Sequence, residues 1–172
     1  MSLLETKKEY SQRGSFDELY TPEEAVNMIL PFIPKHVKTI WECTAIKNSK
    51  IVDVLIKKGY NVITTHIENG QDFFIYEPNG YDMIITNPPY SLKDRFLERA
   101  FKLKKPFMFL LPLTTLEGIK RGKMFEKYGI QLIIPNKRFN FKPEKNSSAW
   151  FQTSWFCYGL NLNKDLNFIE LK

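Results

Sequence analysis

The sequence contains few of the residues from which metal centres and disulfide frameworks are built. Only two cysteines, Cys43 and Cys157, and two histidines occur among its 172 residues. Two cysteines so far apart fit neither a disulfide framework nor the ligand spacing of a zinc site, and we interpret both as small buried hydrophobes. We therefore expect no metal site, and a reducing cytoplasm as the compartment.

Long apolar runs are also missing. No stretch approaches the roughly 18 apolar residues that indicate a membrane-spanning helix, and residues 1–13 are polar and charged. The sequence thus predicts no membrane segment and no export signal.

Acidic residues are fewer than basic ones. Lysine and arginine number 25 against 19 aspartates and glutamates, which gives a net charge of +6. This excess suits a polyanionic partner such as nucleic acid, and it also occurs in basic proteins that bind none. Charge alone leaves the partner open.

Apolar residues make up 43% of the chain, which is enough to bury the core of one compact domain. Apolar runs alternate with amphipathic stretches, a pattern typical of an α/β sheet. We expect a flexible segment over 1–19 and a single domain over 20–172 without a separate target-recognition domain. The predicted helices span 21–32, 49–58, 91–104 and 116–128, and the predicted strands span 37–41, 60–67, 82–86, 106–113, 130–135, 150–160 and, as an added edge, 166–171.

Local signals mark where these helices begin and end. Thr21-Pro22-Glu23-Glu24 combines an N-cap residue, a first-turn proline and a capping-box glutamate, which predicts a helix start. Gly59 and Gly129 follow the second and fourth predicted helices, where glycine commonly ends a helix.

The most informative segment is the strand over 82–86, which leads directly into Asn87-Pro88-Pro89-Tyr90. Two successive prolines have no N–H and a fixed φ, and Pro88 keeps Asn87 out of the helical region. The loop therefore presents hydrogen-bond acceptors without competing donors. A competing interpretation is that Pro-Pro only ends a strand and starts a helix at Ser91.

An exocyclic amine on adenine would find two acceptors in this loop, the Asn87 side-chain oxygen and the Pro88 carbonyl. Holding the amine in this way favours a pyramidal nitrogen whose lone pair faces an electrophilic methyl group. Catalysis would then rest on orientation and electrostatics rather than on a strong base. Tyr90 would stack on a base that has left its duplex.

Several further segments stand in a matching order. Tyr20-Thr21-Pro22 precedes the first predicted strand, Asp72-Phe73 follows the second, and the proline loop comes next. Downstream lie Lys137-Arg138-Phe139-Asn140-Phe141 and Ser154-Trp155-Phe156. Over about residues 20–160 this order resembles the amino-group methyltransferases that use S-adenosylmethionine, in particular small phage- and prophage-type N6-adenine DNA methyltransferases.

The resemblance implies a Rossmann-like α/β fold, doubly wound and mostly parallel, of the seven-stranded type with an antiparallel last strand. It implies methyl transfer from S-adenosylmethionine to the N6 amino group of adenine in DNA, with Asn87, Pro88, Pro89 and Tyr90 in the catalytic role. The implied cofactor-binding residues are Tyr20, Thr21, Glu42, Thr44, His66, Asp72 and Phe73. Glu42 is alternatively a strand-end carboxylate satisfied within the chain.

The resemblance leaves the substrate polymer open. Asn-Pro-Pro-Tyr also occurs in enzymes that methylate guanine N2 in RNA or the side-chain amide of glutamine in proteins. All of these are planar amino groups attached to sp² carbon. The motif therefore specifies the amine rather than the polymer that carries it.

Two positions depart from the family's pattern. The loop from Glu42 to Ser49 contains no glycine, and Ile46 or Lys47 stands where the family keeps its first glycine for close approach to the cofactor. His66 stands where a carboxylate usually binds the ribose hydroxyls. Three alternatives follow: S-adenosylmethionine bound weakly by a remodelled loop, another ligand, or an empty pocket in a catalytically degenerate module that binds nucleic acid or a partner protein.

Basic and aromatic residues are interleaved late in the chain. Lys137, Arg138, Phe139 and Lys142 form a candidate nucleic-acid-binding strip for phosphates and stacked bases. Aromatic residues at strand spacing also occur in cores, and this alternative stays open. Target recognition would lie in 114–123 and 136–150, or in a partner, either a second copy in a homodimer or a separate recognition subunit.

Overall fold

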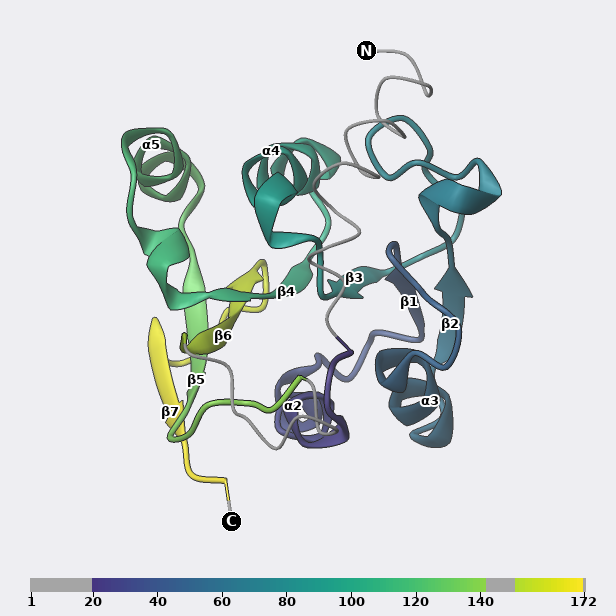
Figure 1. Ribbon diagram of the computed structural model, residues 1–172, viewed down its shortest axis with the longest axis horizontal. Helices are drawn as coiled ribbons and strands as arrows, with labels where there is room; N and C mark the ends of the chain where they lie inside the picture. Colours follow the sequence, from purple (N-terminus) through teal and green to yellow (C-terminus); the bar gives the residue numbers. More distant parts are fainter. Residues whose placement is uncertain (1–19, 142–150, 172) are drawn as a thin grey trace.

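The computed structural model describes residues 20–141 and 151–171, and one seven-stranded β-sheet runs through them (Figure 1). The predicted segment 1–19 lies outside the described residues. The strands lie in the order β2-β1-β3-β4-β6-β5-β7. Their bounds are β1 Thr39–Glu42, β2 Asn61–Thr64, β3 Met83–Thr86, β4 Phe107–Pro112, β5 Gln131–Pro135, β6 Thr153–Tyr158 and β7 Leu166–Ile169.

The sheet is mostly parallel. β2, β1, β3 and β4 run in one direction, and β5 and β7 run parallel to each other. β6 lies antiparallel to both β4 and β5, so β5 and β7 share the direction of the first four strands. The expected Rossmann-like α/β fold is confirmed, with the antiparallel direction confined to β6 and with β7 as a parallel edge. A helix connects β4 to β5, as a parallel crossover requires, and β6 fills the gap between them.

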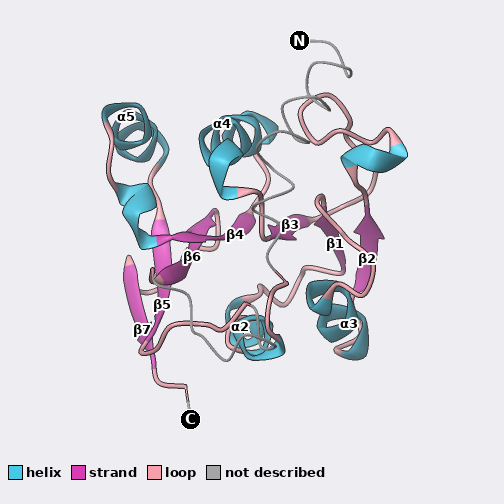
Figure 2. Cartoon of the chain, viewed as in Figure 1, coloured by secondary structure: helices cyan, strands magenta, loops and turns pink. Residues whose placement is uncertain are grey.

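Helices cover both faces of the sheet (Figures 1 and 2). α2 Glu23–Asn27 and α3 Lys50–Lys57 lie on one face, and α4 Lys93–Leu103 and α5 Ile119–Tyr128 lie on the other. The short 3-10 helices are η3 Leu30–Phe32, η4 Ile67–Asn69, η5 Tyr90–Leu92 and η6 Leu113–Leu116. All four expected helices are present. The first is shorter than predicted, because α2 ends at Asn27 and a separate 3-10 helix, η3, covers the end of the predicted span. Within the described ranges, no helix is long and apolar enough to cross a membrane.

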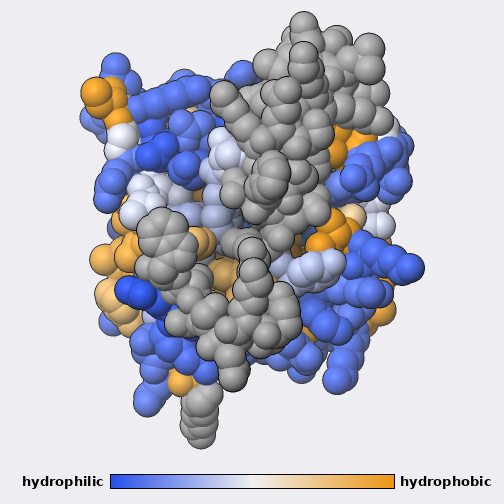
Figure 3. Space-filling model, viewed as in Figure 1, coloured by the Kyte–Doolittle hydropathy of each residue, from blue (hydrophilic) through white to orange (hydrophobic). Residues whose placement is uncertain are grey.

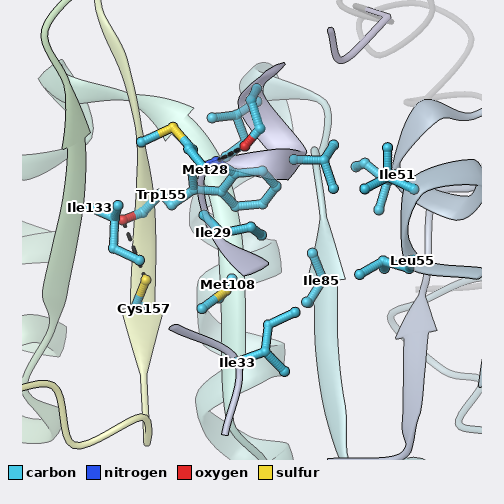
Figure 4. Close-up of a cluster of buried hydrophobic side chains, with 14 of the residues drawn as sticks. Met28, Ile29, Ile33, Ile51, Leu55, Ile85, Met108, Ile133, Trp155 and Cys157 are labelled. Carbon is cyan, nitrogen blue, oxygen red and sulfur yellow. Dashed lines mark hydrogen bonds between the residues drawn. The ribbon is translucent and has the colours of Figure 1, made fainter. Parts of the chain in front are cut away.

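The face under α2 and α3 is an apolar cluster in which Trp155 of β6 is completely buried (Figure 4). Its indole Nε1 donates a hydrogen bond to the Ala25 carbonyl oxygen at 2.8 Å. A continued α-helix would direct the Ile29 N–H to that oxygen, but this N–H donates to Val26 O at 3.2 Å. Trp155 thereby holds α2 against the sheet and gives the Ala25 carbonyl a partner.

The opposite face is rich in aromatic side chains. Phe73 stacks on Phe96 of α4 with ring centroids 4.8 Å apart, and Phe107 and Phe109 of β4 lie 4.6 Å apart. All four are buried. The buried residues of α4 are Phe96, Leu97, Ala100 and Phe101, whose spacing places them on one face of the helix. This aromatic layer supports the carboxyl ends of β1 and β3 from one side.

The start of α2 differs from the expected capping box. Pro22 occupies the N-cap position and no side chain caps the helix. The Thr21 hydroxyl instead accepts a hydrogen bond from Asn87 Nδ2 at 3.1 Å, so the predicted capping box was wrong. A partner distant in sequence has replaced the local one. Gly59 and Gly129 do follow α3 and α5 as predicted, with φ of 91° and 75°.

Trp155→Phe should destabilise the protein without changing its fold. The substitution removes the donor to Ala25 O and leaves a small cavity, so we expect the free energy of unfolding to fall by roughly 2–4 kcal/mol. Urea denaturation followed by circular dichroism measures the change. Ile119→Ala, at a side chain 82% exposed on α5, is the control and should change it by less than about 0.5 kcal/mol. Equal midpoints for the two variants would contradict this role of Trp155.

Candidate functional site

The strand order places a switch point between β1 and β3. From β1 the chain passes to β2 on one side and then crosses back to β3 on the other. In sheets of this kind, ligands bind outside the carboxyl ends of the two strands at such a point. Glu42 ends β1 and Thr86 ends β3. Two polar side chains therefore stand where the fold favours a ligand.

One carboxylate and two hydroxyls form the centre of this region, and we refer to Glu42, Thr44 and Thr86 as the Glu42 cluster. Glu42 Oε1 accepts from the Thr86 hydroxyl at 2.5 Å, from the Thr44 hydroxyl at 3.0 Å and from the Thr44 N–H at 3.1 Å. The two hydroxyl oxygens lie 2.6 Å apart. Since a hydroxyl has one proton, Thr44 Oγ1 donates to one neighbour at a time. The cluster joins the ends of β1 and β3.

Burial changes the acidity of this cluster. It raises the pKa of Glu42 from its ordinary value of 4.5 to about 7, although the hydrogen bonds from Thr86 and Thr44 favour the charged form. Burial also raises the pKa of the neighbouring Cys43 thiol, and the negative charge of Glu42 adds to that rise. Cys43 is therefore a neutral thiol at physiological pH, whereas Glu42 exchanges its proton near neutrality.

Asn87 follows β3 directly and is held by residues from two other parts of the chain. Its Nδ2 donates to Thr21 Oγ1 at 3.1 Å, and its backbone carbonyl accepts from Thr44 Oγ1 at 3.4 Å. The contact with Thr21 fixes the donor side of the amide, so the oxygen Oδ1 lies on the other side. The structure thus brings together Thr21 and Asn87, two predicted site residues, and connects Asn87 to the Glu42 cluster.

The rest of the proline loop turns from the strand into a helix. Pro88 and Pro89 are buried and Tyr90 is partly buried. Pro89 has φ −55° and ψ 123° and immediately precedes η5. The Tyr90 ring meets Phe151 edge-on, with centroids 5.8 Å apart and an interplanar angle of 79°. A planar group stacked on Tyr90 would therefore also lie near Phe151.

A small cavity beside this loop gathers four of the predicted cofactor residues. Its volume is about 20 Å³, and its lining includes Thr44, His66, Asp72 and Phe73. Asp72 Oδ1 accepts from the Phe74 N–H at 3.0 Å, whereas Oδ2 is buried and has no hydrogen-bond partner within the described ranges. Buried carboxylate oxygens are normally paired. The cavity is therefore suited to a donor group from a ligand or a water.

His66 differs chemically from the carboxylate that the family resemblance would place here. Its Nδ1 accepts from the Glu68 N–H at 3.3 Å, so the neutral ring carries its proton on Nε2. A single N–H donor can bond one ribose hydroxyl but cannot accept from two, as a carboxylate does. His66 is also only 5% exposed.

The loop between β1 and α3 turns without glycine. Asn48 has φ 63°, a left-handed conformation that asparagine tolerates better than most residues. The Ser49 N–H donates to Ile46 O at 3.2 Å, and the Ala45 N–H donates to Thr65 O at 3.1 Å. These two N–H groups bond within the chain, whereas a glycine-rich loop would direct such groups to a ligand.

The cavity fits S-adenosylmethionine in chemistry but not in size. The hydroxyl, imidazole and carboxylate of Thr44, His66 and Asp72 suit the polar groups of a nucleoside, and Phe73 adds an aromatic wall. A volume of about 20 Å³ holds one water molecule. A nucleoside therefore fits only if the cavity widens, and the buried stack of Phe73 on Phe96 resists that movement.

The remaining predicted residues are more scattered. Tyr20 is 59% exposed, and Arg138 is exposed as well. Lys137 Nζ pairs with Glu24 at 2.8 Å, and Lys142 lies outside the described residues. Phe139 is completely buried in the cluster under α2 and α3, so its ring cannot stack on a base. The predicted role of Phe139 in stacking on a base is therefore corrected, because its ring is part of the hydrophobic core.

Thr86 was missed from the sequence. It is the one polar side chain in the strand Met83–Thr86, and its place just before Asn87 was the available signal. Phe151 belongs to the late basic and aromatic segment, but its approach to Tyr90 was not predicted, because that contact depends on how distant segments pack.

No protein-family model matches the chain, and no curated protein matches its sequence. In the part of the chain that the structure describes, no group of three or more His, Cys, Asp or Glu side chains could hold a metal ion.

Glu42 should make the stability of the protein depend on pH. Between pH 4.5 and about 7 the folded protein keeps a proton on Glu42 that the unfolded chain releases. The free energy of unfolding should therefore fall across this window as the pH rises, by up to about 3 kcal/mol from this group. Glu42→Gln resembles the protonated acid and should remove the slope. Urea denaturation at a series of pH values measures it.

Asp82→Asn is the matched control for this experiment. Hydrogen bonds from the Thr39 and Lys38 N–H groups, at 2.9 and 2.8 Å, lower the pKa of Asp82. Its stabilisation is lost only as the pH falls through that lowered pKa, which lies below the Glu42 window. The slope should persist in Asp82→Asn, and a slope that also persisted in Glu42→Gln would contradict the assignment.

Proposed function

We propose that the chain transfers a methyl group from S-adenosylmethionine to an exocyclic amine, with adenine N6 in DNA as the substrate class. The position of Asn87 carries the proposal. It stands at the switch point, its Nδ2 is bonded to Thr21, and its carbonyl lies within reach of the Thr44 hydroxyl. The acceptor loop is thus held from both sides before any substrate arrives, as catalysis by orientation requires.

S-adenosylmethionine, bound once the cavity widens, would supply an electrophilic methyl group and leave as S-adenosylhomocysteine, and the methylated amine would release one proton to solvent. The chain's own part is to hold the amine. Asn87 Oδ1 and the Pro88 carbonyl accept its two hydrogens, which favours a pyramidal nitrogen with an available lone pair. Tyr90 supplies an aromatic ring for the base, since chemistry on a base requires that it leave the duplex stack. Thr44, His66, Asp72 and Phe73 would contact the nucleoside.

The choice of DNA rests on the sequence resemblance alone. The proline loop offers acceptors to an amine and no contact that distinguishes deoxyribose from ribose or from a peptide. The net charge of +6 favours a polyanion over a protein substrate. RNA and protein glutamine remain the alternative substrates of the same loop chemistry.

A second candidate is a catalytically degenerate module that binds nucleic acid or a partner protein. Three observations favour it. The cavity has a volume of only about 20 Å³. The N–H groups of Ala45 and Ser49 in the loop after β1 bond within the chain, and His66 offers a donor in place of two acceptors. All three observations concern the region that would bind the methyl donor. None of them concerns the proline loop over 87–90 that would hold the amine.

Titration calorimetry with S-adenosylmethionine separates these candidates. Saturable heat supports methyl transfer, and no heat at millimolar ligand contradicts it and favours the degenerate module. Asp72→Asn should weaken binding roughly 10- to 100-fold, because an amide nitrogen replaces the acceptor Oδ2 while an acceptor for the Phe74 N–H stays. Asp53→Asn is the control, since Asp53 pairs with Lys50 on the surface of α3, and it should leave the affinity unchanged.

Asn87→Ala should reduce methyl transfer at least roughly 100-fold, because it removes an acceptor that acts on the reacting amine. Its affinity for S-adenosylmethionine should stay within about a factor of three, since Asn87 does not line the cavity. Transfer of a radiolabelled methyl group into unmethylated DNA, RNA and protein measures the loss and identifies the polymer. Asn163→Ala, at an exposed asparagine, is the control. Full transfer by Asn87→Ala would show that another residue holds the amine.

A further inference from the structure

The two edges of the sheet differ in chemical character. At one edge, β2 exposes Asn61 and Thr64, which are polar. At the other edge, β7 exposes Leu166 at 49% and Phe168 at 75%. Natural sheets protect open edges with short strands, charges or coverings, because unpaired strands add further strands. Among the described residues β7 has a neighbouring strand on one side only. Nothing within the described residues covers the apolar outer edge of β7.

The exposed side chains of β7 continue an apolar surface of the sheet. Leu166 lies in register with Leu132 of β5, and Phe168 lies in register with Ile134. Residues in register on parallel strands share a face, so all four lie on the face that bears α4 and α5. Figure 3 shows apolar surface over this part of the molecule, at the left of the view. This patch lies apart from the switch point.

The hydrogen bonds to β5 show which backbone groups of β7 face outward. The Leu132 N–H donates to Asp165 O at 2.7 Å, and the Asn136 N–H donates to Ile169 O at 3.0 Å. Backbone groups alternate between the two sides of a strand. The odd-numbered residues therefore bond β5, and the N–H and C=O groups of Leu166 and Phe168 face the open edge.

Two copies could pair their β7 strands around a two-fold axis in only some registers. In each allowed register, a residue whose backbone N–H and C=O groups face the open edge lies opposite another such residue. With the axis at Asn167, Leu166 of one copy lies opposite Phe168 of the other, and Lys164 and Glu170, which flank β7, lie at the same end of the pair. With the axis at Leu166, Phe168 would lie beyond the end of the partner strand. With the axis at Phe168, Leu166 would lie beyond it. Of these three registers, only the one at Asn167 pairs both apolar side chains of each strand.

We propose that a second copy of the chain docks on β7, with the two β7 strands antiparallel and the two-fold axis at Asn167. The pairing makes one continuous sheet through both copies and covers Leu166 and Phe168. The dimer is weak and depends on concentration, because each copy contributes a single edge strand of four residues. The proposal does not depend on the enzymatic activity.

A cysteine cross-link tests the register. Asn167 residues of the two copies would form a non-hydrogen-bonded pair with Cα atoms about 4.5 Å apart, a distance that a disulfide can bridge. Asn167→Cys should therefore form a covalent dimer under mild oxidation. Asp165→Cys, at the more exposed residue that precedes β7, should not, since the two copies of residue 165 would lie four residues apart along the paired strands. The two native cysteines, Cys43 and Cys157, are buried.

Charge reversal tests the same register without cysteine chemistry. Lys164→Glu alone and Glu170→Lys alone each bring like charges to the same end of the paired strands, twice per dimer. Each should raise the dimer dissociation constant in sedimentation equilibrium by roughly 3- to 30-fold. The double variant restores the opposite charges and should return it to the original value. A chain that stays monomeric at its highest soluble concentration would overturn the proposal. Equal cross-linking at positions 165 and 167, or a double variant no better than the single ones, would overturn it too.

Discussion

Burial of the Glu42 carboxyl group is the constraint on which the candidate site depends. A carboxyl group removed from water must be hydrogen bonded or neutral, and Glu42 is both partnered by Thr86 and Thr44 and raised in pKa to about 7. Its donors come from the end of β3 and from the loop after β1. Satisfying this one side chain therefore fixes the distance between two strand ends and the place of Asn87, which follows Thr86 directly.

The acceptor loop is also tied to the outer layer of the fold. Thr21 bonds Asn87 instead of capping α2, so the start of that helix lacks the local stabilisation that a threonine cap commonly provides. Trp155 compensates from the sheet side by donating to Ala25 within α2. The position of Asn87 is thus coupled to the packing of α2, whereas the shape of the cavity lined by Asp72 and Phe73 depends on the aromatic stack of Phe73 and Phe96.

The proposed pairing through β7 has a consequence for the candidate sites. β7 runs in the same direction as β1 and β3, so an antiparallel pair of β7 strands turns the second copy around. In the continuous sheet, the carboxyl ends of β1 and β3 in one copy then point in the opposite direction to those in the other copy. The two candidate sites of such a dimer therefore face in opposite directions.

Periodicity and turn chemistry are local, and they were enough to predict the α/β alternation, the helices ended by Gly59 and Gly129, and the Asn-Pro-Pro-Tyr loop at the end of a strand. Three features depend instead on packing between distant segments: Thr21 bonds Asn87, Thr86 completes the Glu42 cluster, and Phe139 lies in the core. Each of these depends on strand order, which brings together residues far apart in the chain. A hydroxyl or an aromatic ring suits several roles equally well, and the neighbours that packing supplies select one of them.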